Sequence, residues 1–265
     1  MSFLQIAESV STGHFEALQR AESPCPSQGS GLTCSSRAVT RQYSNCTNHW
    51  ICRALRVSSA CLHGGNEYGE EWHRAGTLER KQNVFDDFIA AGEFLVREKF
   101  TSPSRLGILG GSNGGLLVGA VTNQRPELFA AAVLSVGVLD MLRYHRLGIG
   151  YAWAGDYGTA DTPEGFKYLS AYSPYHNIRA GVKYPAVLAM TADHDDRVFP
   201  GHTFKYTAAL QAAQAADKPI LLRVETRAGH GGGTPLSKLI EKAADWLSFL
   251  VRYTDAGTGA TEGPQ

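Results

Sequence analysis

A serine within a glycine-rich turn is the residue of this chain best suited to nucleophilic chemistry. Residues 110–114 read Gly-Gly-Ser-Asn-Gly, which contains the pattern Gly-x-Ser-x-Gly with Ser112 at its centre. Apolar stretches flank the turn at residues 105–109 and 116–120. This arrangement predicts a strand, a sharp turn and a helix whose amide dipole points at the serine oxygen. A glycine-rich loop that only turns the chain is the competing interpretation.

Two later loops supply a base and an acid. A serine hydroxyl needs a base to take its proton, and the base needs an acid to orient it. Residues 191–198 (Thr-Ala-Asp-His-Asp-Asp-Arg-Val) follow an apolar stretch, and residues 226–233 place His230 between glycines after another. The chain order Ser, Asp, His is that of α/β-hydrolases. The pattern therefore predicts Ser112 as nucleophile and His230 as base.

Each of these signals also has a plain structural interpretation. The aspartates at 193, 195 and 196 could cap the helix expected from residue 201. His230 could be a surface histidine in a loop. His194 is a rival base, although it adjoins the acidic residues and has the wrong chain order. Three signals in the right order, each after a strand, favour the catalytic interpretation.

Alternating strands and helices must position these residues. The spacing predicts helices at 83–96, from the turn to about 123, at 201–216 and at 235–251, and strands at 106–109, 130–136, 184–190 and 220–225. This alternation predicts an α/β-hydrolase fold: a mostly parallel sheet with helices on both faces, incomplete at its N-terminal side. The site is expected beyond the carboxyl ends of the strands.

Composition and charge limit the classes of binding partner that the sequence indicates. It has 265 residues, 43% of them hydrophobic, and a formal net charge of +0. Neither nucleic acid nor an anionic membrane is indicated as a partner. No stretch is apolar enough to span a membrane, and the N-terminus resembles no secretory signal, so a cytoplasmic location is expected. The triad chemistry needs no cofactor.

Residues 1–62 differ in composition from the rest. We expect them to form an irregular segment, followed by a catalytic domain at 63–253 and a flexible tail at 254–265. All five cysteines lie in the first segment, at positions 25, 34, 46, 52 and 61. A zinc site with His49 or His63 is conceivable, but the spacings match no tight Cys-x-x-Cys pair. Incidental thiols are the favoured interpretation, and no metal site is predicted.

From about residue 64 to 252 the chain resembles the catalytic domain of prolyl oligopeptidase, a serine peptidase family. The runs that carry this resemblance are residues 64–73, 81–88, 110–115, 192–198 and 228–231. The resemblance implies hydrolysis of peptide bonds after proline in oligopeptides, through an acyl-enzyme. It also implies short proline-containing peptides as partners.

The same resemblance implies a role for each matched residue. Ser112 would be acylated, Asp195 would orient His230, and the backbone N–H of Asn113 would be one oxyanion donor. Arg197 would hold a substrate carbonyl. The substrate proline would stack on Trp153, in a pocket lined by Tyr157, Val138 and Val198.

The chain also departs from the family pattern. The family carries a β-propeller, and no propeller repeats are present here, so a propeller domain is a missing partner. The family's second oxyanion donor is a tyrosine hydroxyl, and Tyr43 is the only tyrosine before Tyr68. We expect residues 1–62 to be foreign to the fold, and the chain to be a fragment or the product of a disrupted gene. An esterase or amidase on the same fold, or an inactive remnant, are the alternative functions.

Overall fold

One seven-stranded sheet organises the molecule. The computed structural model describes residues 2–5, 39–41 and 56–254. The strands lie in the order β2-β3-β1-β4-β5-β6-β7, and every neighbouring pair is parallel except β2 with β3. Their bounds are β1 Ser2–Gln5, β2 Val39–Arg41, β3 Arg56–Ala60, β4 Leu106–Gly111, β5 Ala131–Ser135, β6 Ala186–Ala192 and β7 Ile220–Glu225. Three of these strands, β1, β2 and β3, come from residues 1–62, the segment that we expected to be irregular.

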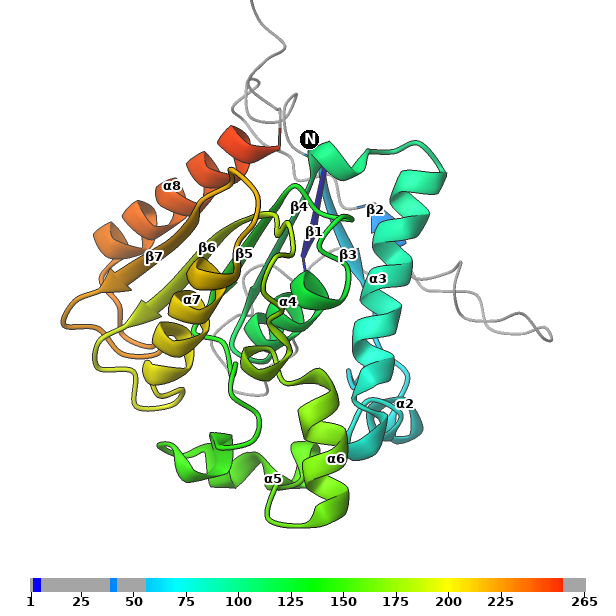
Figure 1. Cartoon of the computed structure of the whole chain (residues 1–265), viewed down its shortest axis with the longest axis vertical. Helices are drawn as coiled ribbons and strands as arrows, with labels where there is room; N and C mark the ends of the chain where they lie inside the picture. Colours follow the sequence, from blue (N-terminus) through cyan, green and yellow to red (C-terminus); the bar gives the residue numbers. More distant parts are fainter. Residues whose placement is uncertain (1, 6–38, 42–55, 255–265) are drawn as a thin grey trace, which may run out of the picture.

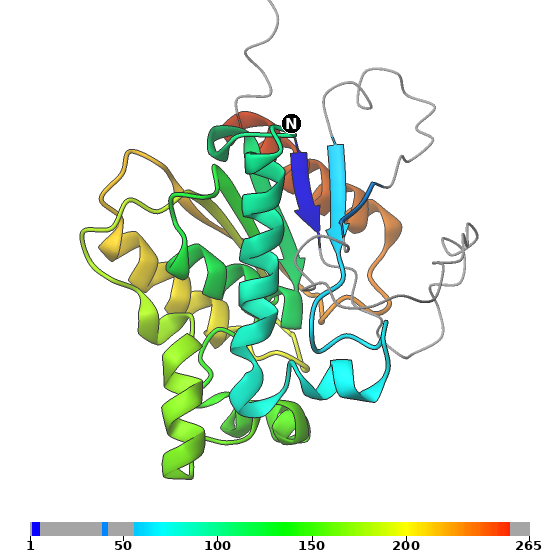
Figure 2. The same cartoon turned by 90° about the vertical axis from the view of Figure 1, so that its right-hand side faces the viewer.

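Helices cover both faces of the sheet (Figures 1 and 2). Ala132 and Leu134 of β5 pack in one core with helices α3 (Gln82–Arg97), α4 (Asn113–Gln124) and α7 (Gly201–Ala213). Ala131 and Val133 pack in a second core with α8 (Leu236–Tyr253). Successive side chains of a strand point to opposite faces, so a fully apolar strand such as β5 feeds both cores. The architecture is that of an α/β-hydrolase, as expected.

The long segment between β5 and β6, residues 136–185, folds beyond the carboxyl ends of the strands (Figure 1). It contains α5 (Ala154–Tyr157) and α6 (Pro163–Tyr172). Helix α6 begins with a proline, and the Thr162 hydroxyl accepts the N–H of Gly165 at 3.0 Å, which caps the helix. The other short helices of the described residues are α2 Glu70–Arg74, η2 Leu78–Arg80, η3 Pro103–Arg105, η4 Tyr144–Arg146, η5 Gly150–Trp153 and η6 Tyr175–Asn177.

Candidate active site

Ser112 occupies the turn between β4 and α4. Its backbone is in the left-handed region, with φ 56° and ψ −117°, a conformation that is unfavourable for a residue with a Cβ. Its N–H donates to the carbonyl of Ser135 in β5 at 2.8 Å, which holds the turn against the next strand. A Cβ on Gly115 would lie 2.7 Å from the Cα of Gly137, so only glycine permits this approach of α4 to the sheet.

Ser112, His230 and Asp195 lie in one chain of contacts. The Nε2 atom of His230 is 3.2 Å from the Oγ of Ser112, and its Nδ1 is 2.8 Å from the Oδ2 of Asp195. The Asp195 side chain is 0% exposed. Because an ionised carboxylate only accepts, the Nδ1 atom carries the imidazole proton and Nε2 is left to accept from the serine.

The turn after β6 fixes the Asp195 carboxylate. Its Oδ1 accepts the backbone N–H groups of Arg197 at 3.0 Å and Val198 at 2.8 Å. The rival histidine, His194, contacts its neighbour Asp193 at 2.7 Å and is 75% exposed. Asp193 in turn accepts backbone N–H groups of the loop that carries His230, so it ties the two loops together.

A pocket of about 360 Å³ opens beside Ser112. The residues expected to contact substrate that line it are Asn113, Val138, Trp153, Tyr157 and Arg197. The Tyr157 hydroxyl donates to the Oδ1 of Asn113 at 2.7 Å, so the segment between β5 and β6 is bonded to the turn that carries Ser112. The structure does not place Val198 among the described residues that line this pocket. Val198 is buried and contributes its backbone N–H to Asp195 instead.

The pocket has further polar residues to which the sequence assigned no role. His63 lines the pocket, and its Nδ1 atom is 2.6 Å from the Oδ2 of Asp87. His73 also lines it, and its Nε2 is 3.4 Å from the Oδ1 of Asp156. Lys81 is a third polar residue in this lining. His73 and Lys81 belong to the two runs at 64–73 and 81–88, and His63 directly precedes the first run; all three lie far from Ser112 in the sequence but line the same pocket.

The described residues give no sign of a metal site or a membrane segment. No group of three histidine, cysteine or acidic residues among them could hold a metal ion. No helix in the described part of the chain is long and apolar enough to cross a membrane. Tyr43, His49 and four of the cysteines, at positions 25, 34, 46 and 52, lie outside the described residues.

Comparison with known proteins gives one consistent result. Residues 56–257 match the pattern of the prolyl oligopeptidase family. The chain is 53% identical over 191 residues to a prolyl endopeptidase of Elizabethkingia miricola, across 72% of this chain and 27% of that protein. It is 48% identical over 196 residues to a prolyl endopeptidase of Dictyostelium discoideum, across 73% of this chain and 26% of that protein.

The structure gives the same result. A solved prolyl endopeptidase superposes with a TM-score of 0.79 at 45% identity, covering 96% of this chain and 34% of that one. The chain thus spans about a quarter to a third of the length of these relatives. The match at residues 56–257 includes the turn of Ser112 and the loops of Asp195 and His230. The chain belongs to the prolyl oligopeptidase family of serine peptidases.

Proposed function

We propose that this chain hydrolyses peptide bonds after proline in short peptides, by means of Ser112, His230 and Asp195 and through an acyl-enzyme. The observation that carries the proposal is the continuous contact from Ser112 Oγ through the His230 imidazole to the buried Asp195 carboxylate, at 3.2 and 2.8 Å. The prolyl endopeptidase names of its relatives support the choice of proline.

The contacts allow a two-step reaction. Ser112 Oγ attacks the substrate carbonyl as its proton passes to His230 Nε2, and a tetrahedral intermediate forms. The imidazolium then gives that proton to the leaving amine, the peptide C–N bond breaks, and an ester on Ser112 remains. Water attacks this ester with His230 again as the base, which releases the acid and restores the serine. Asp195 holds the imidazole in the required tautomer throughout.

The helix that follows Ser112 supplies charge stabilisation. Asn113 is the first residue of α4, so its backbone N–H is one of the groups that a helix leaves without an intrahelical partner. We assign this N–H to the oxyanion of the intermediate. Tyr157 holds the Asn113 side chain at 2.7 Å and so fixes the residue that makes this donation.

The pocket beside Ser112 suits a proline ring. Trp153 offers a flat aromatic face, and Val138 and Tyr157 line the same space. Burial of the ring there would orient the scissile bond toward Ser112. The guanidinium of Arg197, also in the pocket lining, is assigned to a substrate carbonyl through a charge-assisted hydrogen bond.

Labelling with a fluorophosphonate tests the triad directly. The full chain should be modified at Ser112, as read by mass spectrometry of the peptide that contains residues 110–115, and Ser112→Ala should not be modified. Asp195→Asn should label slower by about 10⁴, because the imidazole then takes the wrong tautomer. An unlabelled wild-type chain that is folded by circular dichroism would identify an inactive remnant.

A substrate series tests the specificity. The chain should cleave a peptide amide with proline before the bond in preference to matched amides with alanine or arginine. Faster turnover of a simple ester, with no preference for proline, would instead assign the site to an esterase or amidase.

A further inference from the structure

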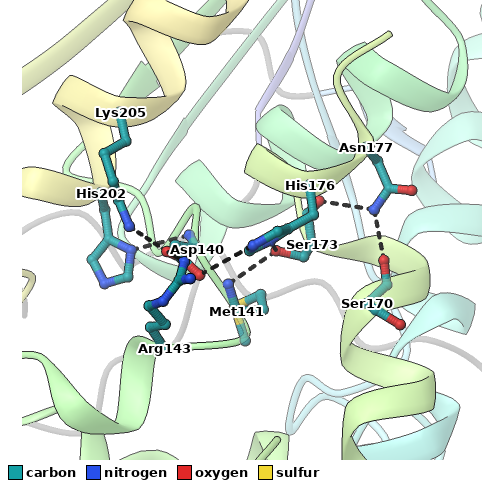
Figure 3. Close-up of polar contacts among 9 residues, drawn as sticks. All are labelled: Asp140, Met141, Arg143, Ser170, Ser173, His176, Asn177, His202 and Lys205. Carbon is teal, nitrogen blue, oxygen red and sulfur yellow. Dashed lines mark hydrogen bonds and ion pairs between the residues drawn. The ribbon is translucent and has the colours of Figure 1, made fainter.

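A buried carboxylate outside the triad lies in the loop that follows β5. Asp140 is 0% exposed and is an acceptor for the Lys205 ammonium group of α7 (Figure 3). The Nη1 atom of Arg143 donates to the same carboxylate oxygen, Oδ2, at 3.3 Å. Burial of a carboxylate is unfavourable unless it is paired, so Asp140 and Lys205 hold this loop and α7 together as a unit.

The backbone of the loop is held by two further side chains. The N–H of Asp140 donates to Nδ1 of His202 at 3.0 Å, and the N–H of Met141 donates to Oγ of Ser173 at 3.0 Å. His202 is on the first turn of α7 and Ser173 follows the end of α6. Two consecutive amides are therefore tied to two different helices.

A histidine closes the arrangement. The Nδ1 atom of His176 is 2.8 Å from Ser173 Oγ, and its Nε2 faces Asp140 Oδ1 at 3.9 Å (Figure 3). That carboxylate oxygen is buried and makes no hydrogen bond within the described part of the chain. We call Asp140, Ser173, His176, His202 and Lys205 the Asp140 clamp.

The clamp joins two parts of the candidate active site. Val138, which lines the substrate pocket, lies two residues before Asp140. His202 lies four residues after Val198, whose N–H holds the Asp195 carboxylate. The loop itself begins at Val136, whose φ of 46° is unfavourable for a β-branched residue. Such a conformation persists only where surrounding contacts impose it.

We propose that the Asp140 clamp sets the position of Val138 in the substrate pocket and thereby the preference for proline over smaller residues. The clamp residues are positioning residues, because none of them lines the pocket and their side-chain hydrogen bonds within the described residues run to one another, to Arg143 and to the loop backbone. This inference rests on the proposed function, since it concerns the specificity of the same site.

Two substitutions test the clamp in the full chain. Asp140→Asn keeps the shape and removes the charge, and Lys205→Met removes the ammonium group that pairs with the buried carboxylate. The measurement is kcat/KM for two peptide amides that differ only in proline or alanine before the cleaved bond. We expect the proline-to-alanine ratio to fall about tenfold in both variants, since a displacement of 1 Å near a reacting group costs up to ~10². Lys205→Arg keeps the positive charge, so its proline-to-alanine ratio should stay much closer to that of the wild-type chain than the ratio of Lys205→Met.

Two controls separate positioning from general damage. The rate of fluorophosphonate labelling of Ser112 should change less than about twofold, because this small probe does not need the proline pocket. Arg143→Met should leave the ratio within about twofold, because the Arg143 side chain is 61% exposed and Lys205 remains. A loss of labelling in parallel with cleavage would overturn the proposal and indicate a structural role alone.

Hydrogen exchange gives a readout that does not depend on activity. The amides of Asp140 and Met141 should exchange faster in Asp140→Asn than in the wild-type chain. Unchanged exchange, or an unchanged proline-to-alanine ratio, would overturn the proposal. If the wild-type chain cleaves neither amide while the exchange rises on substitution, the proposed peptidase function fails and the clamp itself is supported.

Discussion

Burial acts differently on two neighbouring groups of the Asp140 clamp. Burial lowers the pKa of His202 to about 4. Burial also acts to raise the pKa of Asp140, but the hydrogen bond and charge of Lys205 outweigh it and hold that pKa below its ordinary value. At neutral pH, His202 is therefore uncharged and Asp140 is ionised. These states match the geometry, because a neutral imidazole nitrogen can accept the Asp140 N–H.

The His202 pKa predicts an acid-sensitive fold. The unfolded chain binds a proton at this residue near pH 6.5, whereas the folded chain binds it only near pH 4. The unfolded state thus binds more protons between these values, so the free energy of unfolding falls as the pH drops from about 6.5 to 4. The loss should approach roughly 3 kcal/mol, measured by urea denaturation across this range.

A substitution isolates this contribution. His202→Asn can still accept the Asp140 N–H through its Oδ1 but does not titrate, so its stability should vary less with pH over the same window. The pKa of His176 is also lowered by burial, so this residue too makes the free energy of unfolding fall at low pH. Because His176 is present in both proteins, its contribution cancels when their pH dependences are compared. Equal pH dependence in the two proteins would contradict the assignment to His202.

At the scale of single elements, the close approach of α4 to β5 depends on a residue without a side chain. A Cβ at Gly115 would lie 2.7 Å from the Cα of Gly137 and 2.9 Å from the carbonyl oxygen of Ser135. Backbone atoms cannot move aside as a flexible side chain can, so Gly115→Ala should lower stability by about 1–3 kcal/mol. It should also slow the labelling of Ser112, because α4 carries the N–H that we assign to the oxyanion. Thermal denaturation and labelling rates measure the two effects.

A second glycine serves as the control. A Cβ on Gly155, in α5, would meet no atom within 4 Å. Gly155→Ala should therefore be neutral or stabilising by up to about 1 kcal/mol, with unchanged labelling. Equal behaviour of the two variants would show that the approach of α4 is not what limits the site.

The elements with clear apolar periodicity were predictable from the sequence. Strand β7 has the expected bounds at Ile220–Glu225, and α3, at Gln82–Arg97, extends the expected helix by one residue at each end. Helix α6 was not predicted, although Thr162 and Pro163 form a recognisable start signal. Strands β1 and β2 are four and three residues long, too short for periodicity to reveal.

In the candidate site, too, some residues carry a local sequence signal, whereas others are brought together only by tertiary packing. The residues of the proposed triad each follow a strand, so the sheet topology brings them to one edge, as the chain order led us to expect. The Asp140 clamp has no such signal. His202 is 62 residues from Asp140 in the sequence and Lys205 is 65 residues from it, and no motif links them. Only the packing of α7 against the loop after β5 brings them together.

At the scale of the whole molecule, one apolar stripe remains exposed on α8. Leu236 is 71% exposed, Leu239 44% and Ile240 59%. These residues share one face of the helix, because they are three and four positions apart. Leu221 of β7, the strand at one end of the sheet order, is 45% exposed. An exposed apolar helix face and an exposed strand at the end of a sheet each promote association between molecules.

Charge on this stripe should reduce that association. Leu236→Lys with Ile240→Lys should lower the apparent mass measured by light scattering at high protein concentration, without a change in Ser112 labelling. Ser237→Lys with Ser248→Lys adds the same charge at exposed positions of α8 and leaves the stripe intact. If this control lowers the mass equally, net charge and not the apolar stripe governs association.

The left-handed backbone at Ser112 lowers the stability of the fold at the position where the proposed reaction needs a side chain. A side chain at φ 56° and ψ −117° costs about 1–3 kcal/mol, and only a residue without a Cβ relaxes there. Ser112→Gly should therefore melt at a higher temperature than the wild-type chain, even after the extra entropy of glycine in the unfolded state, whereas Ser112→Ala should not. The most heat-resistant single variant at this position would then be one that has lost the proposed nucleophile.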